Sequence, residues 1–238
     1  MAQDLAVPDP PQALKEWLAA RNRADSVLAH GFQLSLDWWN NHLAGLPGTP
    51  LTSKEGDTAG AGRVDRSDVF ALAPAATEDE SGNAALRLLW YSLWWGSGES
   101  RRNNKQRIAS VGADPQSAGA LLRDAARSAS GSPQDAFKTL IPKRPAIAWL
   151  GPSYVTKYLY FAGAGRPAHP CLIVDARVMT TLYRELKWPW FANPRKAFGP
   201  KTYEVAMRVL STWAERLSTE ERVVAPDEVE RWAFAVGK

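Results

Sequence analysis

Residues 149–178 read WLGPSYVTKYLYFAGAGRPAHPCLIVDARV, and this stretch holds the densest set of chemically informative side chains in the chain. Gly151-Pro152 predicts a tight turn and Ser153 is a natural N-cap, so a helix is expected to begin here. That helix carries Lys157 in its first turn or so. The helix macrodipole disfavours a cation near the N-terminus, so we expect Lys157 to lose its proton more easily than a surface lysine, as a nucleophilic amine requires.

Asp175 follows Lys157 at the end of an apolar run, where it would cap a helix over residues 176–186. A carboxylate is favoured at a helix N-terminus, unlike a lysine. On spacing alone, an exposed lysine and a simple N-cap aspartate explain the two residues better than a catalytic pair does.

Charge is distributed unevenly along the 238 residues, whose formal net charge is +4. Residues 1–84 carry 6 basic and 12 acidic side chains, residues 85–208 carry 19 basic and 7 acidic, and residues 209–238 carry 4 basic and 6 acidic. A basic middle region is typical of a protein that neutralises phosphates with one surface, although an ordinary solvated face explains it equally well.

Several classes of protein are excluded by the composition. The single cysteine, Cys171, excludes an internal disulfide framework, an all-cysteine zinc site and a four-thiolate iron–sulfur cluster. His30, His42 and His169 are scattered and are expected to be structural, so no metal site is predicted. Phosphate-binding and dinucleotide fingerprints are missing, so no cofactor is expected. Without a secretory signal or a long apolar run, the protein is expected to be soluble, cytoplasmic and free of membrane contact.

Helical periodicity predominates along the chain. Residues 46–83 are rich in Gly, Pro, Ser, Thr and Asp and predict a long loop with a short ordered piece at 69–72. Strand signal is confined to residues 171–174. Helices are predicted over residues 11–29, 84–95, 107–111, 116–128, 133–140, 146–150, 154–162, 176–186, 201–217 and 227–234, with a tryptophan-containing segment at 33–43. The pattern therefore predicts a mostly α-helical protein.

The turn before Lys157, the Thr156-Lys157 pair, the apolar run and Val174-Asp175 together resemble the helix-hairpin-helix (HhH-GPD) DNA glycosylase superfamily, most closely its 8-oxoguanine DNA glycosylase and AP lyase branch. The resemblance implies a mostly α, two-lobed fold with a helix-hairpin-helix element and little or no β structure. It covers residues 85–238, the expected catalytic region. The acidic residues 1–84, with their long loop, are expected to form part of the second lobe.

The same resemblance implies roles for individual residues. Lys157 would be the nucleophile, and Asp175 would stabilise the cationic sugar-like transition state. Leu150-Gly151-Pro152-Ser153-Tyr154 stands where the family has a Gly-x-Gly turn. The aromatic side chains that the resemblance places around the extruded base are Tyr154, Tyr158, Phe161, Trp232 and Phe234, although ordinary core packing explains the last two better.

Residues 98–108, GESRRNNKQRI, resemble the asparagine-rich loop that fills the gap left by a flipped base in this family. Arg102 or Asn103 would be the wedge, with Arg107 beside it, and Arg177 would contact a phosphate. Without the resemblance, this run is interpreted as a solvated basic loop. The expected DNA-binding residues are Arg101, Arg102, Asn103, Asn104, Arg107, Gly151, Ser153 and Arg177.

The function that follows is a DNA glycosylase that flips a damaged or modified base out of duplex DNA and cleaves its N-glycosidic bond, with or without β-lyase activity. The substrate is 8-oxoguanine or another modified base, and defence against foreign (phage) DNA is an alternative to housekeeping repair. The protein is expected to act as a monomer and to be nucleoid-associated when bound to DNA. Two other classes stay open: a non-catalytic helix-hairpin-helix DNA-binding module, and a helical protein-interaction domain with exposed tryptophan pairs.

Overall fold

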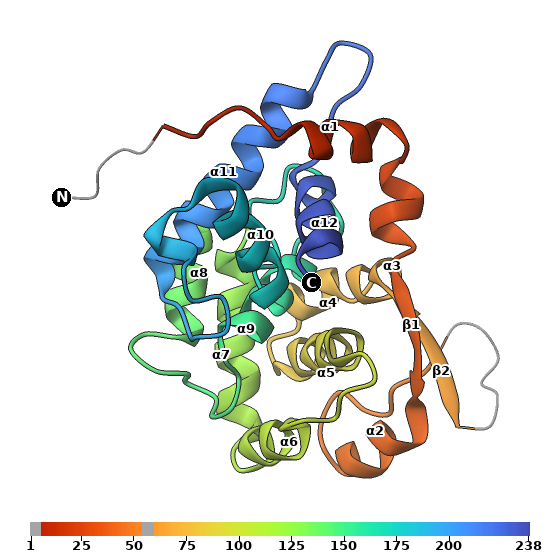
Figure 1. Cartoon of the computed structure of the whole chain (residues 1–238). Coiled ribbons are helices and arrows are strands. Elements are labelled where there is room, and N and C mark those ends of the chain that lie inside the picture. Colours follow the sequence, from red (N-terminus) through yellow and green to blue (C-terminus); the bar gives the residue numbers. More distant parts are fainter. Residues whose placement is uncertain (1–5, 54–59) are drawn as a thin grey trace.

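Helices make up most of the computed structural model, which describes residues 6–53 and 60–238. Within these residues the predicted mostly α-helical fold is confirmed, with a single small β-hairpin. The elements in chain order (Figure 1) are α1 (Gln12–Ala19), the π-helical turn η1 (Ala24–Leu28), β1 (Gly31–Ser35), α2 (Leu36–Leu43), β2 (Ala61–Asp65), α3 (Arg66–Phe70), α4 (Ala73–Glu78), α5 (Asn83–Ser97), α6 (Asn104–Gly112), α7 (Pro115–Ser128), α8 (Pro133–Leu140), α9 (Pro152–Phe161), α10 (Ala176–Leu186), the 3-10 turn η2 (Pro189–Phe191), α11 (Pro200–Leu217) and α12 (Pro226–Val236).

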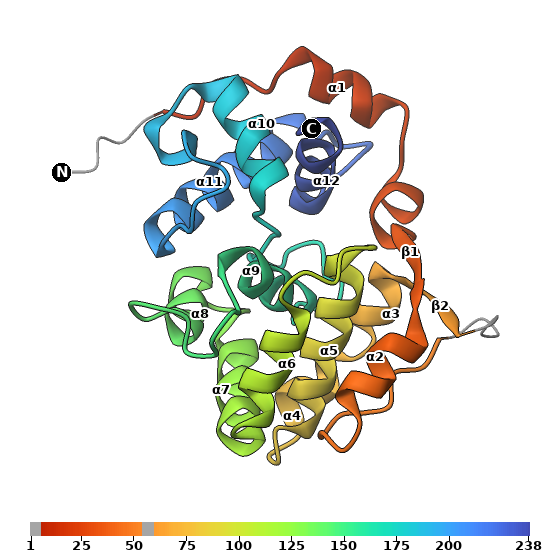
Figure 2. The same ribbon diagram turned by 60° about the horizontal axis from the view of Figure 1, so that its bottom comes forward.

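The helices form two groups that meet at α9. Figure 2 shows α1, α10, α11 and α12 on one side and the elements from β1 to α8 on the other. Helix α9 contacts α5, α7 and α8 of the larger group, and the chain that follows it leads directly into α10. The smaller group is held together by packing of α12 against α1, α10 and α11. Helix α9 therefore lies where the two groups face each other.

Helix α5 is apolar on nearly all sides and forms the core of the larger group. A helix of this kind must be surrounded by protein, and α5 packs against α3, α4, α7, α9 and both strands. Trp90 and Trp94 are fully buried, and the Trp90 indole N–H donates to the carbonyl of Pro47 at 2.9 Å. Neither α5 nor any other helix of residues 6–53 and 60–238 is long and apolar enough to cross a membrane.

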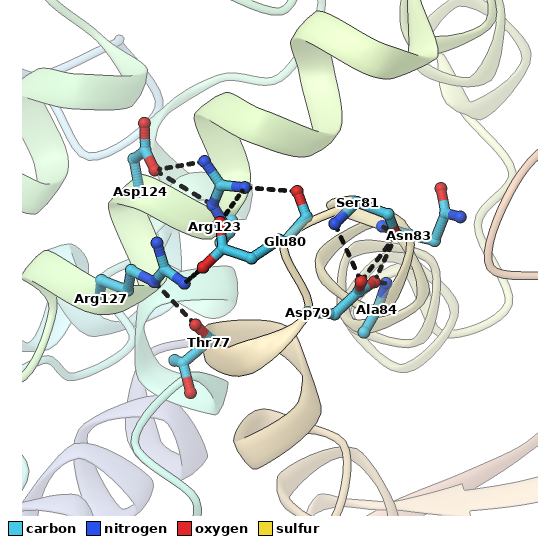
Figure 3. Close-up of polar contacts among 9 residues, drawn as sticks. All are labelled: Thr77, Asp79, Glu80, Ser81, Asn83, Ala84, Arg123, Asp124 and Arg127. Carbon is cyan, nitrogen blue, oxygen red and sulfur yellow. Dashed lines mark hydrogen bonds and ion pairs between the residues drawn. The ribbon is translucent and has the colours of Figure 1, made fainter.

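The start of α5 is fixed to α7 by a polar cluster at the α4–α5 turn (Figure 3). The carboxylate of Asp79 accepts the backbone N–H of Ala84 at 2.9 Å, which satisfies one of the free donors at this helix end. Glu80 forms ion pairs with Arg123 and Arg127 of α7. Because these pairs are exposed, they fix the direction of the turn more than they stabilise the fold.

The prediction of a long loop over residues 46–83 is wrong for most of the residues that the structure describes there. Residues 54–59 of this stretch lie outside the described part of the chain. Residues 61–65 form β2, which pairs antiparallel with β1 in the register Gly31 to Asp65 and Ser35 to Ala61. Gly31 permits this pairing, because a Cβ there would lie 2.4 Å from the Val64 carbonyl oxygen. Asp65 and Asp68 then form a capping box that starts α3. These elements are too short for periodicity to reveal them.

The predicted strand at residues 171–174 is also wrong, because the segment is buried but pairs with no strand in the described part of the chain. Side chains satisfy its backbone instead. Thr156 Oγ1 accepts the N–H of Val174 and donates to its carbonyl, both at 3.1 Å. Cys171 is fully buried here, and burial raises the pKa of its thiol to about 12, although a hydrogen bond with Tyr203 opposes this. A strand-like run can thus be anchored entirely by neighbouring helices.

Most predicted helices are confirmed, and α8 and α10 have the predicted bounds. Residues 146–150 form turns rather than a helix, and Trp149 adopts a left-handed φ of 66°. The predicted helix at 11–29 divides into α1 and η1, and the segment at 33–43 divides between β1 and α2. The differences lie where the chain changes direction.

A buried ion pair connects α3 to α12 across the two groups. Arg66 and Glu230 are both 0% exposed, and Arg66 NH1 lies 2.8 Å from Glu230 Oε2. The same NH1 donates to the hydroxyl of Tyr160 on α9 at 2.9 Å. Burial raises the pKa of Glu230 above its usual value, although the charge of Arg66 opposes this. One guanidinium therefore joins three helices that are far apart in sequence.

We predict that Arg66→Met lowers the free energy of unfolding by about 3–5 kcal/mol, because it leaves Glu230 buried without its cation. The measurement is urea unfolding at neutral pH. Lys201→Ala, which removes an exposed partner of Glu204, is the matched control and is expected to cost less than about 1 kcal/mol. Equal losses in the two variants would contradict the prediction.

Candidate active site

Lys157 lies on α9, at the point where the two groups of helices meet. Gly151 is the N-cap and Pro152 the first residue of α9, so Lys157 is in the second turn rather than the first. Its side chain is 8% exposed, and Nζ lies 3.1 Å from Oδ2 of Asp175 and 3.4 Å from the carbonyl oxygen of Ser153. The carboxylate of Asp175 is therefore the main charged neighbour of this amine.

Asp175 caps α10 and faces Lys157 at the same time. Its Oδ1 accepts the backbone N–H of Arg177 at 3.0 Å and of Val178 at 3.2 Å, while Oδ2 accepts from Lys157. Burial would raise the pKa of Asp175, but the Lys157 ammonium and the two N–H donors outweigh it and hold the pKa below its ordinary range. The site thus contains a carboxylate that stays ionised while largely enclosed.

The alignment of these two residues is set by Thr156. Its hydroxyl bonds both backbone groups of Val174, so the residue before Asp175 is held against the residue before Lys157. Thr156 is itself 0% exposed. This pair of hydrogen bonds brings together two residues that are separated by a turn and an extended segment.

A cavity of about 170 Å³ opens beside Lys157 and Asp175. Its walls come from β1, the end of α5, the extended segment before α10, and α12. The volume is below that of pockets that enclose drug-sized ligands and fits a small planar group. The lining residues are Phe32, Trp95, Gly96, Ser97, Gly98, Lys157, Ile173, Asp175, Glu230 and Phe234.

Phe234, which the resemblance places among the residues that hold the extruded base, lines this cavity and is flanked by cations. The guanidinium carbon of Arg177 lies 4.1 Å from the ring centroid, and that of Arg231 lies 5.6 Å away. Arg177 also donates to the carbonyl oxygens of Ala235 and Gly237 at the end of α12. Arg177, expected on a phosphate, here fixes the position of the Phe234 ring.

The other aromatic residues predicted for the pocket lie outside its lining. Phe161 is fully buried behind Trp95, with ring centroids 5.2 Å apart. Tyr158 donates its hydroxyl to the carbonyl of Leu122 at 2.9 Å, and Trp232 packs on Trp213 of α11. These three side chains therefore support the walls from the core.

Tyr154 lies between the catalytic candidates and the asparagine-rich loop. Its ring faces Lys157 Nζ at 5.6 Å and the Arg107 guanidinium at 4.0 Å, and its hydroxyl lies 3.2 Å from Ser97 Oγ. Tyr154 lines a neighbouring groove instead of the cavity. Its ring thus contacts both the amine of Lys157 and the guanidinium of Arg107.

The predicted DNA-binding residues divide into two sets. Asn104 and Arg107 point inward: Arg107 donates to the side-chain oxygen of Asn104 at 2.6 Å and to the carbonyl oxygens of Arg102 and Trp149, both at 3.0 Å. The other set reaches the surface or borders the groove, with Asn103 in a left-handed conformation of φ 62°. This set comprises Arg101, Arg102, Asn103, Gly151 and Ser153.

Three residues that line the cavity could not be identified from the sequence alone. Glu230 is a fully buried carboxylate on the same helix as Phe234. Gly96 is in contact with the lysine, since a Cβ there would lie 2.7 Å from Lys157 Cδ. Trp95 belongs to a predicted core helix, so its exposure to a cavity is invisible in the pattern. Each depends on which chain segments meet in space.

Titratable and metal-ligating groups near the cavity are few. His30 contacts Trp95 and Phe234, and burial together with Arg66, Arg231 and Arg177 lowers its pKa to about 3. It is therefore neutral at physiological pH. Among residues 6–53 and 60–238, no group of three or more His, Cys, Asp or Glu side chains could hold a metal ion.

A comparison with protein families gives one match, which covers residues 25–234 and hence most of the chain. The matching family is described as "Putative 8-oxoguanine DNA glycosylase OGG-like protein". No curated protein and no solved structure matches the chain.

The low pKa of Asp175 predicts how its contribution to stability depends on pH. The ionised carboxylate stabilises the fold above its ordinary pKa of about 3.8, and this stabilisation is lost as the pH falls through the lower value of the folded protein. We expect Asp175→Asn to cost roughly 2 kcal/mol at pH 7, with a difference from the wild type that shrinks towards pH 3.

Urea unfolding of both proteins across this pH range provides the measurement. Asp124→Asn, which alters a mostly exposed partner of Arg123, is the control and should change little at any pH. A cost for Asp175→Asn that is constant from pH 7 to pH 3 would show that Asp175 does not carry the expected charge.

Proposed function

Because the chain belongs to the 8-oxoguanine DNA glycosylase OGG-like family, we propose that it excises a damaged or modified base from duplex DNA with Lys157 as the nucleophile. The observation that carries the proposal is the distance of 3.1 Å between Lys157 Nζ and Asp175 Oδ2 at the wall of a base-sized cavity. In this proposal residues 85–238 supply the catalytic groups, residues 1–84 complete the second lobe, and the protein acts as a monomer.

The reaction begins with extrusion of one nucleotide, which costs a few kcal/mol of stacking and pairing. The base enters the cavity between side chains of α5 and α12, where Trp95 and Phe234 offer aromatic surfaces. Its sugar then lies next to Lys157. Glu230 also lines the cavity, but both of its carboxylate oxygens accept from Arg66, so its contribution is to hold α12 against the cavity.

Lys157 in its neutral form attacks C1′ of the sugar. The new C–N bond forms as the glycosidic bond breaks, and the bonding electrons leave with the base, which takes up a proton. Asp175, held ionised by two backbone N–H groups, stabilises the positive charge that develops on the sugar. Loss of a proton from the attached nitrogen and opening of the sugar ring give a Schiff base, from which β-elimination can cleave the strand.

The substrate class is 8-oxoguanine or another modified base, in the cell's own DNA or in foreign DNA. Duplexes that carry 8-oxoguanine, uracil, an abasic site, or a hydroxymethylated or glucosylated cytosine separate these cases. Efficient excision of 8-oxoguanine alone indicates repair of oxidised DNA. Excision confined to a modified cytosine indicates defence against phage DNA.

Lys157→Gln is expected to abolish the covalent adduct that borohydride traps between the protein and its preferred duplex, while DNA binding is retained. Asp175→Asn is expected to lower the trapping rate by roughly 10²–10³-fold, because it removes the charge that stabilises the transition state. Lys201→Gln, which alters an exposed lysine in the first turn of α11, is the control and should trap like the wild type.

An adduct that persists in Lys157→Gln would overturn the lysine assignment. Base release without any adduct in the wild type would point to Asp175 and water as the hydrolytic pair. DNA binding with neither adduct nor release on any duplex would support the non-catalytic binding module.

Gly96→Ala is expected to slow trapping by about tenfold or more, because the added methyl group would displace the Lys157 side chain. Gly112→Ala on α6 is the matched control, since a Cβ there meets Leu46 at an ordinary distance of 3.4 Å. Equal trapping rates in the two variants would show that the position of the Lys157 chain does not limit the reaction.

A further inference from the structure

A groove of about 510 Å³ lies beside the proposed active site and is separate from the base-sized cavity. One wall comprises Arg102, Arg107 and the first turn of α9. The other lining segment, residues 194–198, joins η2 to α11 and has no role in the proposed function so far. The residues of the groove are Arg102, Arg107, Gly151, Pro152, Ser153, Tyr154, Ala176, Pro194, Arg195, Lys196, Ala197 and Phe198.

The charge of this groove is of one sign. Its lining contains three arginines and one lysine, and no carboxylate within the described part of the chain. Arg195 and Lys196 are exposed, and neither takes part in an ion pair among residues 6–53 and 60–238. Exposed cations left without partners in a concave surface favour an extended anionic ligand.

The second wall is held in place by aromatic packing on both sides of its two cations. Phe198 stacks on Phe137 of α8 with ring centroids 5.9 Å apart, and Phe191 is fully buried. The backbone N–H of Lys196 donates to the carbonyl of Asn193 at 3.0 Å, which closes a turn. Arg195 and Lys196 are therefore carried on an anchored turn, which lowers the entropic cost of binding a ligand there.

The groove reaches the proposed nucleophile. Ser153 lines the groove, and its carbonyl oxygen accepts from Lys157 Nζ at 3.4 Å. Ala176, another lining residue, directly follows Asp175 in the chain. Residues of the groove therefore adjoin both Lys157 and Asp175.

We propose that segment 194–198 is a second phosphate-binding wall, and that Arg195 and Lys196 contact the phosphodiester backbone of the DNA strand next to the extruded nucleotide. The inference rests on the proposed function for the identity of the ligand. The two walls grip the strand from opposite sides, so that Arg102 and the α9 N-terminus meet one face of the backbone and the two new residues meet the other.

The test compares Arg195→Ala/Lys196→Ala with Lys15→Ala/Lys138→Ala, a control pair on α1 and α8 that removes the same charge away from the groove. Binding to a duplex with a non-cleavable abasic analogue is measured at several salt concentrations. The groove variant is expected to bind at least tenfold more weakly at 0.1 M salt and to lower the slope of log K against log salt by about 1–2, because each lost phosphate contact removes about 0.9. Arg195→Lys/Lys196→Arg should restore most of the affinity.

A methylphosphonate placed at single positions of the substrate strand locates the contacts. At the phosphates next to the analogue, loss of charge should weaken binding by the wild type and the control pair more than binding by the groove variant, which keeps only the contacts of Arg102 and α9. Affinities of the groove variant and the control pair that agree within twofold, with equal salt slopes, would overturn the proposal. Matching urea midpoints for both variants exclude unfolding as the cause of a loss.

Borohydride trapping at saturating DNA separates this inference from the proposed function. The groove variant should trap at the wild-type rate once saturated, because its cations act on binding. A wild type that binds DNA through Arg195 and Lys196 but forms no adduct and releases no base would support the phosphate-binding role of these residues and overturn the proposed glycosylase activity. If the wild type forms the trapped adduct but the groove variant binds DNA like the control pair, only the proposed role of Arg195 and Lys196 is overturned.

Discussion

The buried contact between Arg66 and Glu230 is the constraint on which the arrangement of the candidate site depends. Arg66 follows β2, Glu230 lies near the end of the chain, and the Tyr160 hydroxyl that shares the guanidinium lies three residues after Lys157. Fully enclosed charges are costly unless they are paired and hydrogen-bonded. Alternative packings of α12 would leave one of these groups uncompensated, so the pair favours the one arrangement in which α12 closes the cavity.

Local sequence chemistry was sufficient for most of the longer helices but not for the central pair of residues. Residues 133–140 and 176–186 carry their own start signals, so their bounds were predictable. Lys157 and Asp175 were predictable as neighbours only through the family resemblance, and Thr156 provides the physical link between them. Lys157 and Asp175 are thus held together by direct contacts between α9 and the segment that leads into α10.

What the sequence could not predict depends on distant segments. The hairpin of β1 and β2 joins residues that flank a polar stretch, and its stability comes from pairing rather than from composition. Glu230 and Gly96 enter the cavity because α12 and α5 happen to meet Lys157 there. Arg107 was expected to face DNA, yet its guanidinium donates to the carbonyl oxygens of Arg102 and Trp149. It thereby joins two loops, each of which contains a residue in the left-handed conformation.

The burial of Cys171 has a practical consequence for spectroscopy. The chain contains one cysteine, it is inaccessible, and its thiol remains protonated at neutral pH because burial raises its pKa to about 12. Maleimide reagents react with exposed thiolates, so the native residue can be left in place. Two cysteines introduced on the surface, one on each group of helices, would then be the only sites for fluorophores or spin labels, and the distance between the groups could be followed without altering the core.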